Sequence, residues 1–300
     1  MNSKGYFADR LIASRLADLQ DFDHEPNVKR EDEGGCGVTG FASTIPMPGR
    51  HIFEPSIRMH NRGNGKGGGI AAVGFDPDRL GVSREILDTH YMLNIALLEP
   101  SCLAALKEDF VTPYFDVAHE EMLDHIPDYR ELEGLEVKPP DVWRAFVRVK
   151  PDVMKPFVQR YGLIGMKDRW VEDEFISRNS NALNRRFYSS LGEKQAFVLS
   201  HGINLMILKI VGYAENVVKY YKLDDFPAHI WIAHQRYPTR GRVWHPGGAH
   251  PFIGLNEALV HNGDFANYHA VCDYLRQRGI APQFMTDTEV SVLLFDLWNR

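Results

Sequence analysis

Residues 34–41 read GGCGVTGF, in which a cysteine sits in a glycine-rich turn and is followed at once by an apolar run. The run after Cys36 predicts a β-strand, and glycines on both sides allow close backbone approach there. The stretch before it, DHEPNVKREDEGG (residues 23–35), is polar and highly charged, which is typical of an exposed and cleavable linker. A folded domain is therefore expected to begin at Cys36.

The composition is that of an ordinary globular protein. The 300 residues are 44% hydrophobic and 25% charged, with a formal net charge of -6, so the chain can bury a sizeable core. No apolar run approaches the roughly 18 residues that span a bilayer, and the acidic balance gives no electrostatic reason to expect nucleic acid. Three scattered cysteines, Cys36, Cys102 and Cys272, favour a reducing compartment. We expect a cytoplasmic protein with neither a membrane nor a nucleic-acid partner.

A second glycine-rich segment, HNRGNGKGGG, covers residues 60–69 and leads into an apolar run from Ile70 that predicts a strand. A Walker A loop would continue from its Gly-Lys into Ser or Thr and then a helix. Here Lys66 is followed by Gly67 and a strand. The glycines therefore favour close backbone approach to some other group over phosphate binding.

Residues 80 to 190, approximately, predict an inserted α+β region. A strand followed by a helix is expected twice, at YMLNIALL (91–98) with PSCLAALKEDF (100–110), and at WRAFVRVK (143–150) with PDVMKPFVQRYG (151–162). A doubled β-α unit of this kind indicates a ferredoxin-like arrangement. The polar residues of the region favour a solvated face of a helical stretch over a metal site, although four of them offer ligand atoms: His90, Asp116, His119 and Glu120.

The last third of the chain again shows regular patterns. QAFVLS (195–200) and NLMILKIVG (204–212) predict a β-hairpin, and YHAVCDYLRQRG (268–279) an amphipathic helix. The final helix opens at TDTE (286–289), where Thr286 and Glu289 have the spacing of a capping box. Because that helix reaches Arg300 without a stop signal, we expect the polypeptide to continue beyond it.

The order of the motifs carries a resemblance. Cys36 with its following glycine, HNRGNGKGGG, HQRYPTRG (234–241), HNGDFAN (261–267) and TDTE resemble, in order and content, the class II glutamine amidotransferases. Within that family the chain looks most like the amidotransferase domain of the glutamate synthase large subunit, or its stand-alone relatives, including those linked to N-methylglutamate synthesis. The resemblance covers about residues 36–79 and 190–300.

This resemblance implies an α+β fold, the four-layer α-β-β-α sandwich of the N-terminal-nucleophile hydrolases, interrupted by the inserted ferredoxin-like α+β region at about 80–190. The domain would span residues 36–300. Residues 1–35 would be a pro-segment that is removed so that Cys36 becomes the first residue of the mature chain. Its free α-amino group, with a reference pKa of roughly 7.7 to 8.0, could then serve as the general base.

The resemblance also assigns the catalytic and substrate-binding residues. Cys36 would be the nucleophile, and the side-chain amide of Asn262 with the backbone N–H of Gly263 would form the oxyanion hole. The guanidinium of Arg236 would bind the α-carboxylate of glutamine, for which its planar fork is better suited than lysine. Asp287 would pair with the α-ammonium group.

Two further residues are assigned to the substrate site. Arg62 would support the Cys36 loop, with a structural ion pair as an equal alternative. His250 matches a family His-Pro, with a hydrogen-bonded structural role as the alternative. The histidines of this region would suggest a metallohydrolase, but they lack H-E-x-x-H or comparable spacing and no metal is expected: His234, His245, His250 and His261.

The implied reaction is glutamine hydrolysis through a Cys36 thioester, which yields glutamate and supplies ammonia to a synthase subunit or domain such as that of glutamate synthase. No cofactor is expected in this chain, and FMN and an iron-sulfur cluster would belong to the partner. Two alternatives stay open: an N-terminal-nucleophile amidohydrolase that does not use glutamine, and a non-catalytic regulatory subunit of a glutamate-synthase-like complex.

Overall fold

A computed structural model describes residues 10, 13–14, 35–236, 245–263 and 265–299. The backbone separates into two units, Met1–Glu33 and Gly34–Arg300. The expected pro-segment, residues 1–35, lies almost wholly outside the described residues, and its removal stays a prediction. Residues 237–241 of the HQRYPTRG motif also lie outside them.

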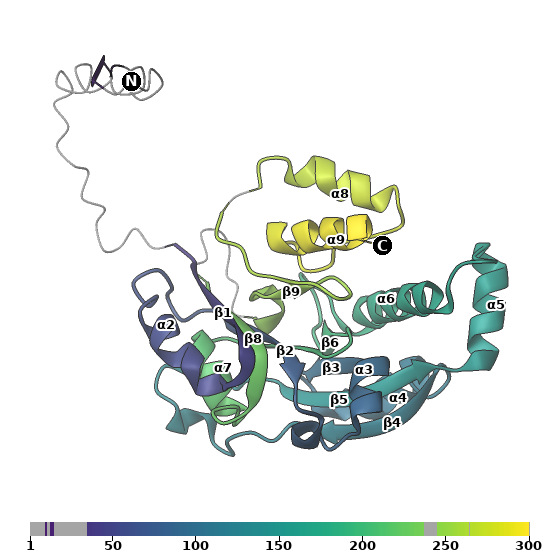
Figure 1. Ribbon diagram of the computed structural model, residues 1–300, viewed down its shortest axis with the longest axis horizontal. Helices are drawn as coiled ribbons and strands as arrows, with labels where there is room; N and C mark the ends of the chain where they lie inside the picture. The colour runs from purple at the N-terminus through teal and green to yellow at the C-terminus, as the bar shows by residue number, and fades with distance from the viewer. Residues whose placement is uncertain (1–9, 11–12, 15–34, 237–244, 264, 300) are drawn as a thin grey trace, which may run out of the picture. The chain divides into compact units, whose positions relative to one another are not determined.

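The larger unit contains two four-stranded antiparallel sheets (Figure 1). The strands of sheet A are, in spatial order, β1 (Gly37–Pro48), β8 (Pro227–Gln235), β2 (Gly68–Phe75) and β7 (Leu205–Ile210). Those of sheet B are β4 (Phe115–Met122), β5 (Asp141–Val149), β3 (Tyr91–Leu97) and β6 (Ala196–Ser200). A short ribbon pairs β9 (Phe252–Ile253) with β10 (Ala258–Leu259). The expected mixed α+β class is confirmed, and the N-terminal-nucleophile sandwich stays a prediction.

The described helices connect and cover these strands. The α-helices are α2 (Phe53–Ile57), α3 (Arg84–Thr89), α4 (Leu103–Phe110), α5 (Pro151–Tyr161), α6 (Asp168–Phe187), α7 (Ala214–Tyr220), α8 (Tyr268–Arg276) and α9 (Asp287–Asn299). Short 3-10 turns are η1 (Gly49–Ile52), η2 (Pro77–Leu80), η3 (Pro100–Cys102), η4 (Tyr129–Glu131) and η5 (Pro246–Gly248). None of the helices described is long and apolar enough to cross a membrane.

One hydrophobic core joins the two sheets. It contains Ile70 of β2 and Leu208 of β7 from sheet A, and Met92 of β3 and Phe146 of β5 from sheet B, and all four are fully buried. Successive strand residues point to opposite faces. The strand residues that alternate with these four point away from the shared core. Those of β3 pack on α4 and α6, and those of β2 and β7 pack on the β9–β10 ribbon.

The elements from β3 to β6 follow the strand-helix-strand-strand-helix-strand order of a ferredoxin-like unit, with two helices, α5 and α6, in the second connection. The central position of β3, between β5 and β6, brings the first strand of the unit beside its last one. The fourth strand of this unit, β6 (Ala196–Ser200), lies beyond residue 190, the approximate end expected for the inserted region.

Two expectations about local structure were wrong. The strands β6 and β7 do not form a hairpin, because β6 pairs with β3 in sheet B and β7 pairs with β2 in sheet A. Both are buried along their whole length, so either sheet could accept them, and the turn between them does not decide which. The segment carrying Asp116 and His119 is not helical but forms a β-strand, β4. It is an edge strand, because it pairs only with β5.

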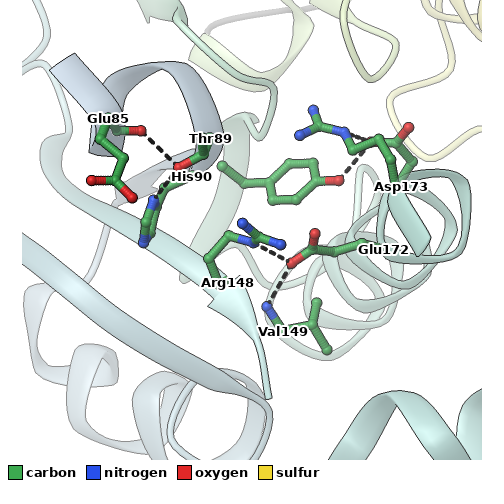
Figure 2. A network of polar contacts seen from close by, with 9 residues as sticks. Glu85, Thr89, His90, Arg148, Val149, Glu172 and Asp173 are labelled. Atoms are coloured by element: carbon green, nitrogen blue, oxygen red, sulfur yellow. Dashed lines mark hydrogen bonds and ion pairs between the residues drawn. The ribbon is translucent and has the colours of Figure 1, made fainter. Parts of the chain in front are cut away.

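Buried carboxylates anchor α6 to sheet B (Figure 2). Figure 2 shows the side chain of Arg148 and the backbone nitrogen of Val149 directed at Glu172. One Glu172 oxygen accepts hydrogen bonds from Arg148 Nε at 2.8 Å and from Val149 N at 2.9 Å. Asp173 accepts one from the Tyr91 hydroxyl at 2.6 Å. Burial and this contact raise the pKa of Tyr91, so the phenol stays protonated and donates.

Replacing Glu172 by Ala is expected to lower the free energy of unfolding by about 1–3 kcal/mol, because the N–H of Val149 is left buried without an acceptor. The control is Glu174→Ala on the same helix, which removes a partly exposed pair with Arg178 and should cost less than about 0.5 kcal/mol. Urea denaturation of both variants measures the difference. Equal losses would contradict the anchoring role of Glu172.

Candidate active site

The site forms where three strands of sheet A end together. In the β1–β8 register Gly37 lies opposite Gln235, and in the β2–β8 register Gly68 lies opposite the same residue. Cys36 precedes Gly37 and Arg236 follows Gln235, so both lie just beyond these paired residues at the same end of the sheet. The backbone N–H of Arg236 donates to the carbonyl of Gly67 at 2.7 Å, which extends the β2 pairing by one residue. The half-buried Cys36 thiol and the Arg236 side chain therefore lie at the same edge.

The glycine-rich segment packs against the end of β8, as the sequence predicts in general terms. A Cβ built on Gly63 would lie only 2.8 Å from Cβ of Gln235, so a larger residue would push the loop away. A Cβ on Gly69 would overlap the carbonyl of His250. These glycines serve close backbone packing around the site, as expected from the mismatch with Walker A.

Arg236 and Asp287 carry opposite charges, and Arg236 lies at the same strand edge as Cys36. Arg236 Nη1 donates to the carbonyl of Gly248 at 2.7 Å, which orients the guanidinium. Burial lowers the pKa of Arg236, whereas its electrostatic interactions with Cys36 and Asp287 act in the opposite direction. Arg236 therefore interacts electrostatically with two residues that are far apart in the sequence.

A histidine pair links Asp287 to β8. His261 Nδ1 lies 3.6 Å from Asp287 Oδ2, and the carbonyl of His261 accepts a hydrogen bond from His234 Nε2 at 3.2 Å. His234 is fully buried, and desolvation lowers its pKa to about 3, so the ring is neutral. These contacts hold the segment that carries Asn262 next to the start of α9.

The predicted oxyanion-hole residues come directly after His261. Asn262 and Gly263 are exposed, so their polar groups are open to a ligand. A Cβ built on Gly263 would lie 2.9 Å from Nε2 of His261, so a larger residue here would displace the His261 ring. Their assignment to an oxyanion hole stays a prediction.

Arg62 and His250 occupy different environments. Arg62 is exposed and lies against the peptide before Cys36, since a Cβ built on Gly35 would be 3.1 Å from its Nη2. His250 is 6% exposed, and its Nε2 lies 3.1 Å from Thr288 Oγ1. Burial lowers the pKa of His250 well below its usual value. Arg62 can thus reach the Cys36 loop, whereas His250 contacts Thr288, the residue after Asp287.

Sequence reasoning missed the network behind the site. The buried amide of Gln235 donates to the carbonyl of Ser56 at 2.6 Å and to Glu215 at 3.2 Å. Glu215 also contacts His60 Nε2 at 2.6 Å, and the His60 ring stacks on Tyr213. The one sequence feature that could have indicated this network is Gln235, a polar residue at the end of a largely apolar strand segment. The network ties the end of β8 to the chain around α2 and α7.

Within residues 35–236, 245–263 and 265–299, no group of three or more His, Cys, Asp or Glu side chains is placed to hold a metal ion. His234 and His250 pack ring against ring, with centroids 4.0 Å apart, and do not converge on a common point.

Comparison with known proteins shows similarity to two kinds of relative. An uncharacterized protein of Archaeoglobus fulgidus is 29% identical over 274 residues, which is 90% of this chain and 64% of that protein. Glutamine–fructose-6-phosphate aminotransferases (isomerizing) of Campylobacter jejuni and Zymomonas mobilis are 32% and 33% identical over 142 and 135 residues. Those matches cover 46% and 45% of this chain, and 23% and 21% of the relatives. The chain thus spans less than two thirds of each. No family model matches it.

The arrangement of charges is of a kind that suits a small dipolar molecule next to a thiol. A cation at Arg236 and an anion at Asp287 complement a ligand that carries both charges at one end. Asn262 and Gly263 add neutral hydrogen-bond donors. This combination suits acyl transfer from an amino-acid amide better than redox or phosphate chemistry.

The buried neutral His234 predicts a pH-dependent stability. Its pKa is about 3 in the folded protein and 6.5 when exposed, so the unfolded chain takes up a proton first as the pH falls. Between pH 6 and pH 5 this costs about 1 kcal/mol of stability. Between pH 6 and pH 5 the free energy of unfolding of His234→Gln should therefore fall by about 1 kcal/mol less than that of the wild type, measured by urea denaturation. The exposed control His269→Gln should show the same pH dependence of stability as the wild type. The same pH dependence in His234→Gln would contradict the conclusion that His234 is buried in its neutral form.

Proposed function

We propose that this chain is a class II glutamine amidotransferase, which hydrolyses glutamine to glutamate and ammonia through a thioester on Cys36. The observation that carries the proposal is that Cys36 and Arg236 lie at one end of sheet A, and that Asp287 is linked through His261 to His234 at the same end of β8. The similarity of nearly half the chain to aminotransferases that use glutamine supports it.

The residues can be given roles in the proposed reaction. Arg236 and Asp287 bind the α-carboxylate and α-ammonium groups, which directs the side-chain amide toward the thiol. The Cys36 sulfur attacks the amide carbon, and Asn262 and Gly263 stabilise the oxyanion. Ammonia leaves, and water then hydrolyses the thioester to release glutamate. The thiol proton passes to the α-amino group of Cys36 once the Gly35–Cys36 bond has been cut.

We further propose that the ammonia serves a synthase subunit or domain, of the glutamate synthase type, with FMN and an iron-sulfur cluster on that partner. The support is the order of the motifs from Cys36 to Glu289, the long spacing between them and the strand sequence NLMILKIVG (204–212).

Two measurements on the purified protein test the role of Cys36. The intact mass should correspond to a chain that begins at Cys36, and glutamate should be released from glutamine. The variant Cys36→Ala should retain residues 1–35 and lose activity at least about 1000-fold, because the nucleophile is missing. An active glutaminase that retains Met1 would overturn the proposed processing, and full activity of Cys36→Ala would overturn the mechanism.

Replacing Arg236 by Lys should raise the KM for glutamine about 10- to 150-fold, because a bidentate charged contact worth about 1.5–3 kcal/mol is lost. Steady-state kinetics of ammonia release measure the effect. Arg58→Lys, at a largely exposed arginine of the same region, is the matched control and should leave KM unchanged. Indifference to Arg236→Lys would favour an amidohydrolase that does not recognise an amino acid.

A further inference from the structure

A buried lysine and a buried glutamate lie behind the proposed substrate site without a part in the reaction described above. Lys209 of β7 is 3% exposed and Glu289 of α9 is 5% exposed. Both line a cavity of about 40 Å³, together with Phe252 and Phe284. Charged side chains are costly to bury, so a pair in this position calls for an explanation.

Glu289 holds the turn that leads into α9. One carboxylate oxygen accepts a hydrogen bond from Gln283 N at 2.5 Å, and the other accepts one from Phe284 N at 2.8 Å. In return, Glu289 N donates to Thr286 Oγ1 at 3.1 Å. This differs from the standard capping box, since the carboxylate reaches back past the cap residue to two earlier amides.

The clamped turn includes a residue with unfavourable backbone geometry. Met285 has φ 58°, a left-handed conformation that is uncommon for a non-glycine residue. Such a conformation persists only where its surroundings enforce it. Two residues later comes Asp287, the first residue of α9. The direction in which Asp287 leaves the turn therefore depends on the bonds made by Glu289.

Lys209 lies in the same cavity as Glu289, beside the aromatic rings that line it. Its Nζ lies 3.8 Å from the ring centroid of Phe252 and 5.5 Å from that of Phe284, within cation–π range. Burial lowers the pKa of Lys209 to about 7 and raises that of Glu289 to about 7, and the charge of each group opposes the shift of the other. Removing either group leaves the other buried without its counter-charge.

We propose that Glu289 and Lys209 are positioning residues, which fix the 283–286 turn so that Asp287 meets the α-ammonium group of the substrate. This inference rests on the proposed function. It predicts selectivity: loss of the pair should weaken recognition of the ammonium group and leave recognition of the rest of the molecule intact.

A neighbouring residue offers a matched control. Asp296, two turns further along α9, is 2% exposed and accepts a hydrogen bond from Leu255 N at 3.1 Å. It is thus a buried acid on the same helix that holds a different loop. A purely structural role for Glu289 would give its variant the same behaviour as Asp296→Asn.

The test compares two substrates, L-glutamine and 4-carbamoylbutanoate, which is glutamine without its amino group. With Glu289→Gln, the KM for glutamine should rise at least about 10-fold, with kcat changed less than about 2-fold, and the kinetics with 4-carbamoylbutanoate should be unchanged. Lys209→Met should show the same selective loss, and it serves as the test if Glu289→Gln does not fold. Asp296→Asn should lower Tm without changing the ratio of the two kcat/KM values.

Two kinds of failure are distinguishable. Equal losses with both substrates, or no loss with either, in both Glu289→Gln and Lys209→Met would overturn this inference and leave the proposed function standing. Absence of ammonia release from glutamine by the wild-type chain would overturn the proposed function, and the inference with it.

Discussion

The site depends on β8 being paired on both sides up to its last residue. Gln235 faces Gly37 on one neighbour and Gly68 on the other, and this double pairing brings Cys36 and Arg236 to the same edge. A side chain at Gly37 would overlap Met59, since its Cβ would lie 2.7 Å from that of the methionine. Buried hydrogen bonds from the Gln235 amide keep the strand end from fraying. The placement of Cys36 next to Arg236 therefore depends on the small size of Gly37 and on the buried hydrogen bonds of the Gln235 amide.

Much of the local structure was predictable, because short apolar runs bounded by Gly, Pro and polar residues are strong signals. The segment from Ile70, the strand at 91–98 and the helix at 151–162 were identified in this way, and they correspond to β2, β3 and α5. The site residues were found differently, through the order of motifs along the chain. In the structure Cys36 and Arg236 lie at the same end of sheet A, and His261 links Asp287 to His234 of β8.

What the sequence could not reveal are partnerships between distant segments. The turn between β6 and β7 is compatible with a hairpin, but each strand finds a better apolar surface in a different sheet. β4 carries so many polar residues that its strand character depends on a neighbour, β5. Lys209 sits within an apolar run, and nothing in that run indicates Glu289, which lies 80 residues later and reaches the same cavity through α9.

The split of β6 and β7 between the sheets has a consequence for biosynthesis. Sheet B draws all its strands from residues 91–200, so it can form once a continuous stretch of chain has left the ribosome. Sheet A needs β1 and β2 from before that stretch and β8 from after it, so its first strand must wait for about 190 residues to be synthesised. Until β8 has been synthesised, the ladder hydrogen bonds of β1 cannot form, because β8 is the strand that pairs with it in sheet A, and the edge that carries Cys36 is the last part of the sheet to be completed.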